Sequence, residues 1–465
     1  MDTWIDHELS GSAFKDKRLE SRFREIVVAM SKGNGKTIPE VCEEWSMAKA
    51  TYRFLSNDRV DESEILAGHF HQTSKRIGAC KGPVLILHDT CEFVYKRKKP
   101  EDIGFTRESK YLNPNVSQKY ESKYKVCGIL MHASLAVSTD GLPLGLIANQ
   151  FWTRKVFKGT RQMKRQINLT RVPIADKESI RWLEGMKKSN RAANTNTSRL
   201  IHIGDRENDI YEYLSECELS GAHYLVRSCV NRLAEESTIA EEMANHNHAY
   251  SHKIEFKDGD GNRVSTNLKI KVKTLTLHPP VDKQKEYTDL TVTMVSAVES
   301  DPPEDRERIK WTFLSNLPVT NREEAITVLG WYKQRWKVEM YFKILKSGLG
   351  AEESKLREAS RLSKLISIFC IIAWRIQWLT MLNRDDEQVS PKLAFDQTER
   401  KILAHYFKKA CKPKTLNDYI NRLARLGGYL DRANDPPPGN TVIWKGLNKL
   451  AKLRAGFELA IDVGN

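Results

Sequence analysis

The stretch PVLILHDT at residues 83–90 decides the fold class of this 465-residue chain. It is a continuous apolar run that ends near a carboxylate, Asp89, and such runs are typical of strands buried on both faces of a sheet. The stretch SRLIHIGDREND at residues 198–209 has the same pattern, with Asp205 at the end of its apolar run. Two buried strands far apart in the sequence predict a sheet covered by helices, which is an α/β fold.

Further strands and helices surround these two. KVCGILMHASLAV (125–137) and GLPLGLIANQFW (141–152) are separated by the turn STDG, so we predict that they and the first strand are antiparallel neighbours. Helices are expected over 176–188 and 210–217, and HYLVRSCV (223–230) is predicted to be a further strand. The order along the chain is therefore three strands, a helix, a strand, a helix and a strand. This order indicates a mixed α/β sheet.

Other regions flank or interrupt this core. Residues 1–75 are basic and have a helical apolar pattern. Residues 231–310 alternate with period two and predict a β-rich antiparallel insertion. A helical zone is expected over 323–382, followed by a polar break and more helices. We therefore predict an N-terminal helical domain, a core spanning 76–382 and a C-terminal helical domain at 383–465.

Composition restricts the classes of protein. The chain has 75 Lys and Arg against 60 Asp and Glu, a formal net charge of +15, which favours a polyanionic partner, nucleic acid before a membrane surface. The longest largely apolar run, Leu365–Trp374, has ten residues, about half of what a bilayer requires. The eight cysteines form no C-x-x-C pair, as expected for reduced thiols. These features lead us to expect a cytoplasmic protein that does not enter a membrane.

The segment GWYKQRWKVEMYFKILKSGLG (330–350) carries the most specific pattern of charges. On one continuous helix, broken only near Gly348–Gly350, five residues would share a face: Tyr332, Arg335, Glu339, Lys343 and Lys346. The opposite face is expected to pack on a core through Trp336, Val338, Phe342, Leu345 and Leu349. The functional interpretation is a carboxylate metal ligand among cations that hold phosphates. The alternative is a solvated face with a Glu339–Lys343 ion pair.

Asp89 and Asp205 could converge on a hard cation. Mg²⁺ prefers oxygen ligands and is often held by one or two carboxylates together with phosphate oxygens. Two such ions about 3.5–4 Å apart can hold the attacking and leaving oxygens of a phosphodiester. Taken singly, each aspartate could instead cap a helix or begin a turn.

Taken together, these residues resemble a known family, the bacterial cut-and-paste DDE transposases of the insertion-sequence-four family, Tn-five-like branch. The family signature Y-(2)-R-(3)-E-(6)-K is matched in full by Tyr332, Arg335, Glu339 and Lys346. LHDTCEFVY around Asp89 and GDRENDIYEYL around Asp205 look like the tracts around the family's two catalytic aspartates. The family's end-binding domain is similar to the N-terminal tracts KDKRLESRF…GKTIPE…ATYRFLSN, and its C-terminal domain is similar to LGGYLDRANDPPPGNTVIWKGLNKL. The resemblance therefore covers nearly the full chain.

The resemblance implies a ribonuclease-H-like core in which Asp89, Asp205 and Glu339 are catalytic and hold two Mg²⁺ ions, with Mn²⁺ expected to substitute. The span of 134 positions from Asp205 to Glu339 fits the family's β-rich insertion. Trp311 looks like the aromatic that stacks on a flipped base, although an ordinary buried strand tryptophan is the alternative. Other DNA contacts are expected from Tyr332, Arg335, Lys343, Lys346 and Arg206.

The two ends of the chain are expected to recognise DNA and to dimerise. Arg18, Arg22 and Arg53 would confer end specificity, since arginine suits bidentate recognition of guanine; the alternative is a solvated helical face. In the C-terminal domain, apolar stripes at 416–426 and 447–457 would support a dimer in which each subunit cuts the end bound by the other. The alternative is that the two stripes pack on each other within one subunit.

Several other clusters are weaker signals. The basic runs at 96–99 and 151–165 could follow phosphates or be solvated. The group His246, His248 and His252 has no matching cysteine, so we expect no zinc site. The turn DGDGN at 258–262 lacks the glutamate of a calcium loop. His88 could serve as a general base, but a two-metal scheme needs none.

The function implied is a DNA transposase that cleaves transposon ends by hydrolysis, forms and reopens a hairpin, and joins the 3′ ends to target DNA. Its partners would be double-stranded DNA, at inverted-repeat ends and at the target, and a second copy of the chain. It would be cytoplasmic in a bacterium and associated with the nucleoid when bound. Two alternatives are a catalytically inactive DNA-binding regulator or inhibitor, and a repair nuclease with the same core.

Overall fold

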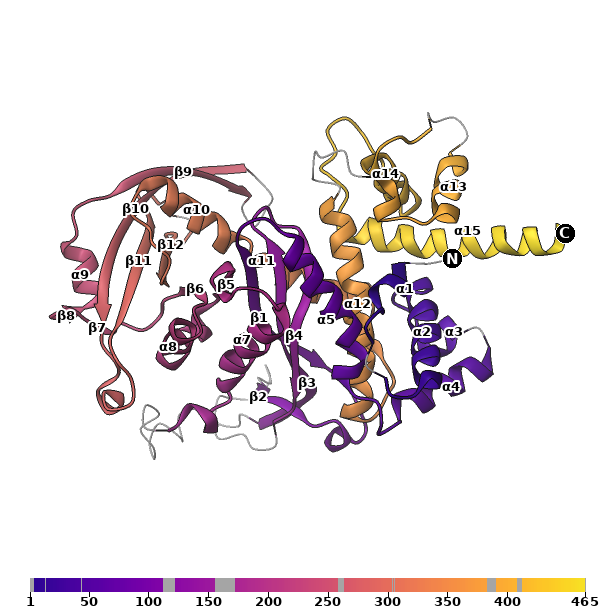
Figure 1. The fold of residues 1–465 in the computed structure, drawn as a ribbon, viewed down its shortest axis with the longest axis horizontal. Helices are drawn as coiled ribbons and strands as arrows, with labels where there is room; N and C mark the ends of the chain where they lie inside the picture. Colours follow the sequence, from indigo (N-terminus) through magenta and orange to yellow (C-terminus); the bar gives the residue numbers. More distant parts are fainter. Residues whose placement is uncertain are drawn as a thin grey trace.

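The structure is a computed structural model, and Figure 1 shows its fold. The described residues are 4–12, 14–42, 44–111, 122–154, 172–257, 263–302, 304, 306–382, 390–407 and 412–464.

A mixed β-sheet forms the centre of the molecule (Figure 1). Among the described residues it has 12 strands, in the order β2-β3-β1-β5-β6-β12-β11-β10-β7-β8, with β4 paired to β3 and β9 paired to β10. The strands are β1 (Val84–Val94), β2 (Phe105–Tyr111), β3 (Ser122–Ser138), β4 (Pro143–Trp152), β5 (Leu200–Gly204), β6 (His223–Arg227), β7 (Leu233–Ala234), β8 (Ser237–Thr238), β9 (Tyr250–Lys257), β10 (Arg263–Leu277), β11 (Leu290–Glu299) and β12 (Lys310–Ser315).

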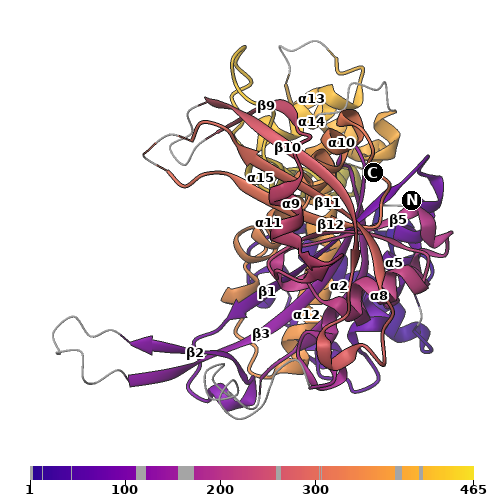
Figure 2. The same ribbon diagram turned by 90° about the vertical axis from the view of Figure 1, so that its left-hand side faces the viewer.

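Strand pairing confirms the predicted α/β class. Strand β3 is antiparallel to both β1 and β4, as expected from the sequence. Strand β5 runs parallel to β1 and β6, so the sheet is mixed. Strand β2, which was not predicted, pairs with the first part of β3, and this hairpin extends away from the body of the protein in Figure 2.

One sequence-based expectation about the sheet was wrong. Strand β1 does not end at Asp89 but continues to Val94, because β3 pairs with it along its whole length. The predicted β-rich antiparallel insertion is present, and its strands extend the core sheet through β12, which pairs with β6. The insertion also contains a helix, α9 (Ile239–Asn245), whose last carbonyls accept hydrogen bonds from Lys271. Part of the charged face of β10 is therefore engaged within the protein.

Helices cover the sheet and form both ends of the chain (Figure 1). The N-terminal helices α1–α5 precede the sheet, and α13–α15 follow it. Their bounds are α1 (Trp4–Glu8), α2 (Lys17–Lys32), α3 (Ile38–Cys42), α4 (Trp45–Leu55), α5 (Glu62–Ala79), α7 (Ile180–Ala193), α8 (Tyr211–Leu219), α10 (Arg322–Lys333), α11 (Trp336–Lys343), α12 (Ala359–Leu382), α13 (Gln397–Tyr406), α14 (Leu416–Leu426) and α15 (Asn440–Gly464).

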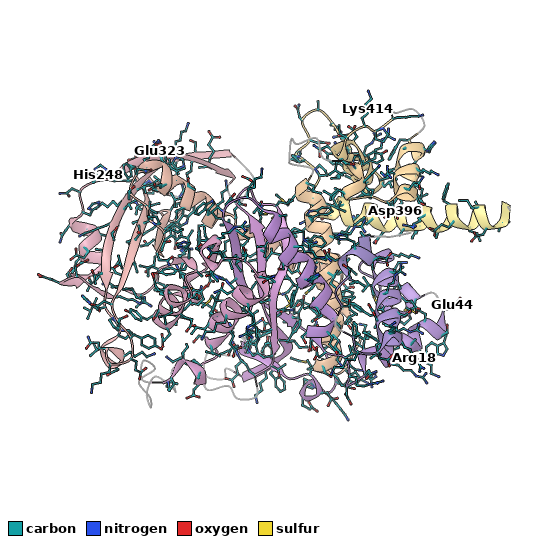
Figure 3. All side chains as sticks on the ribbon, viewed as in Figure 1. Arg18, Glu44, His248, Glu323, Asp396 and Lys414 are labelled. Atoms are coloured by element: carbon teal, nitrogen blue, oxygen red, sulfur yellow. The ribbon has the colours of Figure 1, made fainter. Side chains whose placement is uncertain are left out.

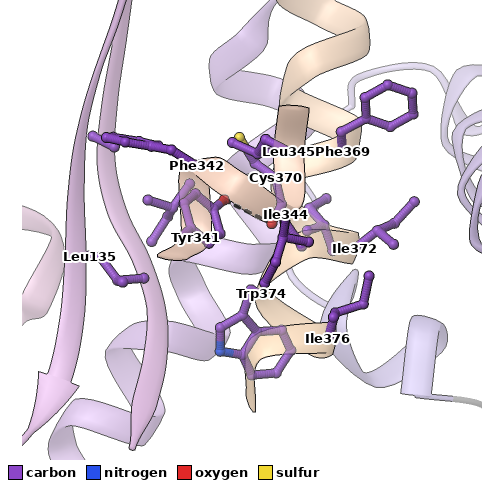
Figure 4. Close-up of a cluster of buried hydrophobic side chains, with 14 of the residues drawn as sticks. Leu135, Tyr341, Phe342, Ile344, Leu345, Phe369, Cys370, Ile372, Trp374 and Ile376 are labelled. Carbon is purple, nitrogen blue, oxygen red and sulfur yellow. Dashed lines mark hydrogen bonds between the residues drawn. The ribbon is translucent and has the colours of Figure 1, made fainter. Parts of the chain in front are cut away.

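Helix α12 is the central helix of the main hydrophobic core. It packs against α5, β4 and the terminal helices, and the side chains around it interlock in Figure 4. Tyr341 Oη donates to the carbonyl oxygen of Cys370 over 2.9 Å, which ties α11 to α12. By length and composition α12 could cross a membrane, but 89% of its most apolar window is buried inside the protein. Its hydrophobicity is thus accounted for by core packing.

The predicted long helix is broken earlier than expected. Helix α10 ends at Lys333, α11 begins at Trp336, and a π-helical turn follows at Ile344–Gly348. The five residues of the charged pattern therefore come from four consecutive segments, which are α10, the turn that holds Arg335, α11 and the π-helical turn, and not from one straight helix. Val338, Phe342, Leu345 and Leu349 are buried as predicted. Trp336 is 62% exposed, so its assignment to the core was wrong.

Candidate active site

Two aspartates lie on neighbouring parallel strands. The ladder between β1 and β5 ends at the pair Leu87 and Ile203. Asp89 and Asp205 each lie two residues further along their own segment, so they occupy equivalent positions beyond the last pair. The Thr90 N–H donates to Asp89 Oδ1 over 2.7 Å. The Glu207 N–H donates to Asp205 Oδ1 over 2.8 Å, which makes Asp205 the cap of a short 3₁₀ helix at 206–208.

Glu339 is connected to Asp89 through the side chain of Arg335. Arg335 lies in the turn between α10 and α11, and its Nη1 is 3.2 Å from Asp89 Oδ2. Its Nη2 is 2.6 Å from Glu339 Oε1, one turn along α11. One guanidinium therefore connects a core strand to α11, although Asp89 and Glu339 are far apart in the sequence. Glu339 is paired to Arg335 here, and not to Lys343 as the solvated-face alternative supposed.

The charges of the other two carboxylates act on the buried carboxyl group of Asp89. Burial raises the pKa of Asp89 to about 6. Arg335 acts in the opposite direction, while the charges of Asp205 and Glu339 add to the rise in the Asp89 pKa. A cluster of partly desolvated carboxylates destabilises its own negative charge, so it favours a bound cation.

The donor set fits a hard divalent ion. All three side chains offer carboxylate oxygens, the ligands that Mg²⁺ prefers. Within the described ranges, no three His, Cys, Asp or Glu side chains are already arranged around one cation position. At this site the guanidinium of Arg335 lies between Asp89 and Glu339 and supplies the positive charge. A divalent ion would have to displace it from those two carboxylates.

The other expected DNA contacts differ in exposure and in their partners. Arg206 and Lys343 are exposed, and Tyr332 is half-buried with its ring 4.3 Å from that of Phe313. Trp311 lies on β12 and is partly buried against the core. Lys346 Nζ is 3.5 Å from Glu352 Oε1, which also accepts from the Val94 N–H over 2.8 Å.

Sequence reasoning missed Glu352, which anchors the signature lysine to β1. It also missed Trp336, whose exposed indole follows Arg335 directly. No motif identified Glu352, because its role depends on a strand more than 250 residues earlier. Trp336 lies one helical turn after Tyr332, so helical spacing alone places this indole beside the charged residues and away from the buried face.

The N-terminal arginines are not equivalent. Arg18 and Arg53 are exposed, and Arg18 lies at the outer edge of the N-terminal helices in Figure 3. Arg22 Nη1 is 2.6 Å from Glu25 Oε2 and 3.4 Å from Met47 Sδ, so it is engaged within the domain. On α4, Trp45 is 75% exposed, and Lys49 and Arg53 are exposed one and two turns further on. Sequence reasoning did not identify Trp45 or Lys49.

The weaker clusters have structural explanations where the structure describes them. His88 is fully buried and its ring bonds to His202 and Ser134, and burial lowers its pKa to about 3, so it cannot reach a substrate as a base. Arg97 donates to the carbonyls of Ser354 and Leu356. The rings of His246 and His248 are 6.5 Å apart and join no metal-binding group among the described residues. The turn at 258–262 and most of the basic run, from 155 onward, lie outside the described residues.

The C-terminal helices bury one part of their apolar stripes and expose another. Leu416, Ile420, Leu423 and Leu426 of α14 are buried, and α14 packs along α15. Intrasubunit packing therefore accounts for the first stripe. The last turns of α15 project from the body in Figure 1, and their apolar side chains are exposed: Phe457, Leu459, Ile461 and Val463.

Comparison with family models gives the class of the protein. Residues 1–60 match a model described as Transposase DNA-binding, and residues 371–463 match one described as Transposase Tn5 dimerisation domain. The two matches support a DNA transposase that binds DNA and forms a homodimer. More particularly, they support a Tn5-like transposase, and domains of this kind suggest an enzyme that cleaves DNA and transfers strands.

Proposed function

We propose that this chain is a DDE transposase of the insertion-sequence-four family that excises a DNA segment bounded by inverted repeats and joins it to target DNA. The observation that carries the proposal is the Arg335 bridge between Asp89 and Glu339, with Asp205 close enough for its charge to raise the pKa of Asp89. The complete Tyr332–Arg335–Glu339–Lys346 signature and the two transposase domain matches support the same conclusion. We also propose that the protein acts in the bacterial cytoplasm, on the nucleoid.

Asp89, Asp205 and Glu339 would hold the divalent ions in this scheme. Two Mg²⁺ ions, or Mn²⁺ in their place, would activate a water molecule and stabilise the leaving oxygen of a phosphodiester. Arg335, Lys343 and Lys346 would hold the phosphates in line for attack, a contribution of positioning and charge rather than a covalent intermediate. Arg335 would thus exchange its two carboxylate partners for a DNA phosphate when the end is bound.

The reaction would proceed by successive attacks at phosphorus. Water attacks at the transposon end, the P–O3′ bond breaks, and the end is left with a 3′-hydroxyl. That hydroxyl gives up its proton and attacks the opposite strand, which forms a hairpin and releases flanking DNA. A second water reopens the hairpin, and the regenerated 3′-hydroxyl attacks the target strand. The resemblance of the sequence motifs supports this order of steps.

End recognition would come from the N-terminal helices. The exposed side chains of Trp45, Lys49 and Arg53 follow one face of α4, which suits a helix placed against a groove of DNA. Arg18 could add a phosphate contact. Trp311, Trp336 and Tyr332 offer aromatic surface near the catalytic cluster, where an unpaired base could stack.

The test uses a supercoiled plasmid that carries the gene with its native flanking DNA. In Mg²⁺ the wild-type protein should release the segment between the flanks as a linear fragment. Asp205→Asn should bind the same flanks in a gel shift with unchanged affinity but release nothing, since it removes a charge needed for the ions. If the wild type binds the flanks and, like Asp205→Asn, never cuts them, the inactive-regulator alternative is correct. If a folded wild-type protein cuts DNA with no preference for the flanks, the nuclease alternative replaces the transposase.

A further inference from the structure

A single arginine outside the signature connects the two segments that bear the aspartates. Arg181 is the second residue of α7, a helix that packs against β1, β3 and β4 (Figure 1). Its Nε donates to Thr90 Oγ1 over 3.2 Å, and its Nη2 donates to Glu207 Oε2 over 2.5 Å. Thr90 follows Asp89 directly, and Glu207 comes two residues after Asp205. The guanidinium therefore spans the space between the two segments.

The same two residues hydrogen-bond the aspartates themselves. The N–H of Thr90 donates to Asp89 Oδ1, and the N–H of Glu207 donates to Asp205 Oδ1. A continuous path thus runs from one carboxylate to the other through Thr90, Arg181 and Glu207. Each link in it is a hydrogen bond with both atoms defined in the structure.

The backbone alone does not fix the separation of these carboxylates. The β1–β5 ladder stops at Leu87 and Ile203, two residues before each aspartate. Beyond that point β1 continues with β3, whereas the chain after β5 turns into a 3₁₀ helix. No main-chain hydrogen bond of this ladder joins the two aspartate positions, so a side chain that bridges the two segments can influence the distance between Asp89 and Asp205.

The surroundings of Arg181 hold its guanidinium rigidly. It lies 5.7 Å from the ring centre of Trp152 and 5.6 Å from that of Trp182, within cation–π range. Its Nη1 donates to the Glu178 carbonyl oxygen over 3.1 Å, and its side chain is 12% exposed. Thr90 is held in turn by His132 Nδ1, 3.0 Å from Thr90 Oγ1. A planar, constrained fork of this kind can fix two acceptors at once, which a lysine cannot.

We propose that Arg181 is a positioning residue that sets the spacing of Asp89 and Asp205 for divalent-ion binding, an inference that rests on the proposed function for the identity of the site. Arg181 acts through Thr90 and Glu207 and touches neither the ion nor the DNA. Groups that orient metal ligands in this way typically change metal affinity or activity by about 10–100-fold when they are removed.

The test measures Mn²⁺ binding to the full-length, DNA-free protein by the loss of the free-ion signal in electron paramagnetic resonance. Arg181→Met keeps the apolar stem and should raise the Mn²⁺ dissociation constant by at least about tenfold. Glu207→Ala should have the same effect, and the double variant should bind no more weakly than either single variant, because all three remove one bridge. Arg181→Lys should lie between wild type and Arg181→Met. Arg335 competes for the carboxylates in every variant, so the ratio of a variant's Mn²⁺ dissociation constant to that of the wild type reports only the loss of the Thr90–Arg181–Glu207 bridge.

The matched control is Lys187→Met, which removes an ion pair of 3.1 Å to Glu216 from the same helix without contacting either aspartate segment. It should bind Mn²⁺ as the wild type does. Plasmid cleavage is then followed against Mg²⁺ concentration, and Arg181→Met should shift the half-saturating concentration upward. If Arg181→Met binds Mn²⁺ like the wild type while the wild type cuts its own flanks, Arg181 does not position the site and the transposase stands. A different outcome is that the wild type binds Mn²⁺, the variants bind it more weakly, and none of the proteins cuts DNA. In that case the positioning role stands and the proposed function fails.

Discussion

Replacing Arg335 by methionine should strengthen divalent-ion binding in the absence of DNA. In the free protein the Arg335 guanidinium lies 3.2 Å from Asp89 and 2.6 Å from Glu339, so an ion must break both contacts to enter. Methionine retains a long apolar side chain but leaves the two carboxylates without this counter-charge. Their mutual repulsion is then relieved only by the ion.

The size of the effect follows from the two contacts. A hydrogen bond between charged groups contributes about 1.5–3 kcal/mol net when it is desolvated. The Glu339 side chain is 34% exposed, so its pair with Arg335 is screened and contributes less. We take about 2 kcal/mol for both contacts together, which corresponds to roughly a 30-fold change in affinity. Arg335→Met should therefore lower the Mn²⁺ dissociation constant of the DNA-free protein by at least about tenfold.

The assay is a Mn²⁺ titration of the full-length protein at pH 8, where Asp89, with a pKa of about 6, is ionised in the wild type. Lys333→Met is the matched control, because it removes an exposed cation two residues away that pairs with neither carboxylate. The same Arg335→Met protein should cleave DNA more slowly, since a phosphate contact is lost. If it binds Mn²⁺ no more tightly than the wild type, with an unchanged thermal midpoint, Arg335 does not occupy the ion position.

Three further predictions concern other parts of the chain. Lys49→Ala should weaken binding to the native flanks, and a lower salt dependence in a fluorescence titration would show the loss of a phosphate contact; an unchanged salt slope would place Lys49 away from the DNA. Burial opposes ionisation of Glu8, but hydrogen bonds from His69 and Arg76 outweigh it and hold the Glu8 pKa below its usual value. The ionised Glu8 therefore stabilises the folded protein above about pH 4.5, and this stabilisation is lost as the pH falls through the folded pKa. Glu8→Gln should therefore lower the free energy of unfolding by about 3 kcal/mol at pH 7 in urea, with a smaller difference at low pH, and an equal difference at both would contradict this. Mixing a Glu339→Ala subunit that binds ends with an active subunit that cannot bind them, because Lys49→Ala and Arg53→Ala remove the exposed cations of α4, should restore cleavage absent from either alone, whereas no cleavage in the mixture would exclude cutting in trans.

The sequence by itself determined the class of fold and the identity of the candidate site residues. Apolar runs such as 83–90 predicted buried strands, because a short, continuous apolar run that ends near a carboxylate is typical of a strand covered on both faces. The spacing from Tyr332 to Lys346 identified the signature, because a local pattern is complete in the sequence alone. The same local information could not show that β1 continues past Asp89, since that depends on pairing with a strand about 40 residues later.

Only the tertiary structure decided how these residues meet. Arg335 bridges Asp89 and Glu339, Arg181 joins the segments that bear Asp89 and Asp205, and Glu352 holds Lys346, and each contact crosses between elements distant in the sequence. The chain turns between α10 and α11, and Trp336 at the start of α11 is exposed. Helical periodicity predicts neighbours three or four residues apart, whereas the partner of a charged side chain across the fold is selected by strand register, helix breaks and burial, which exist only once the chain has folded.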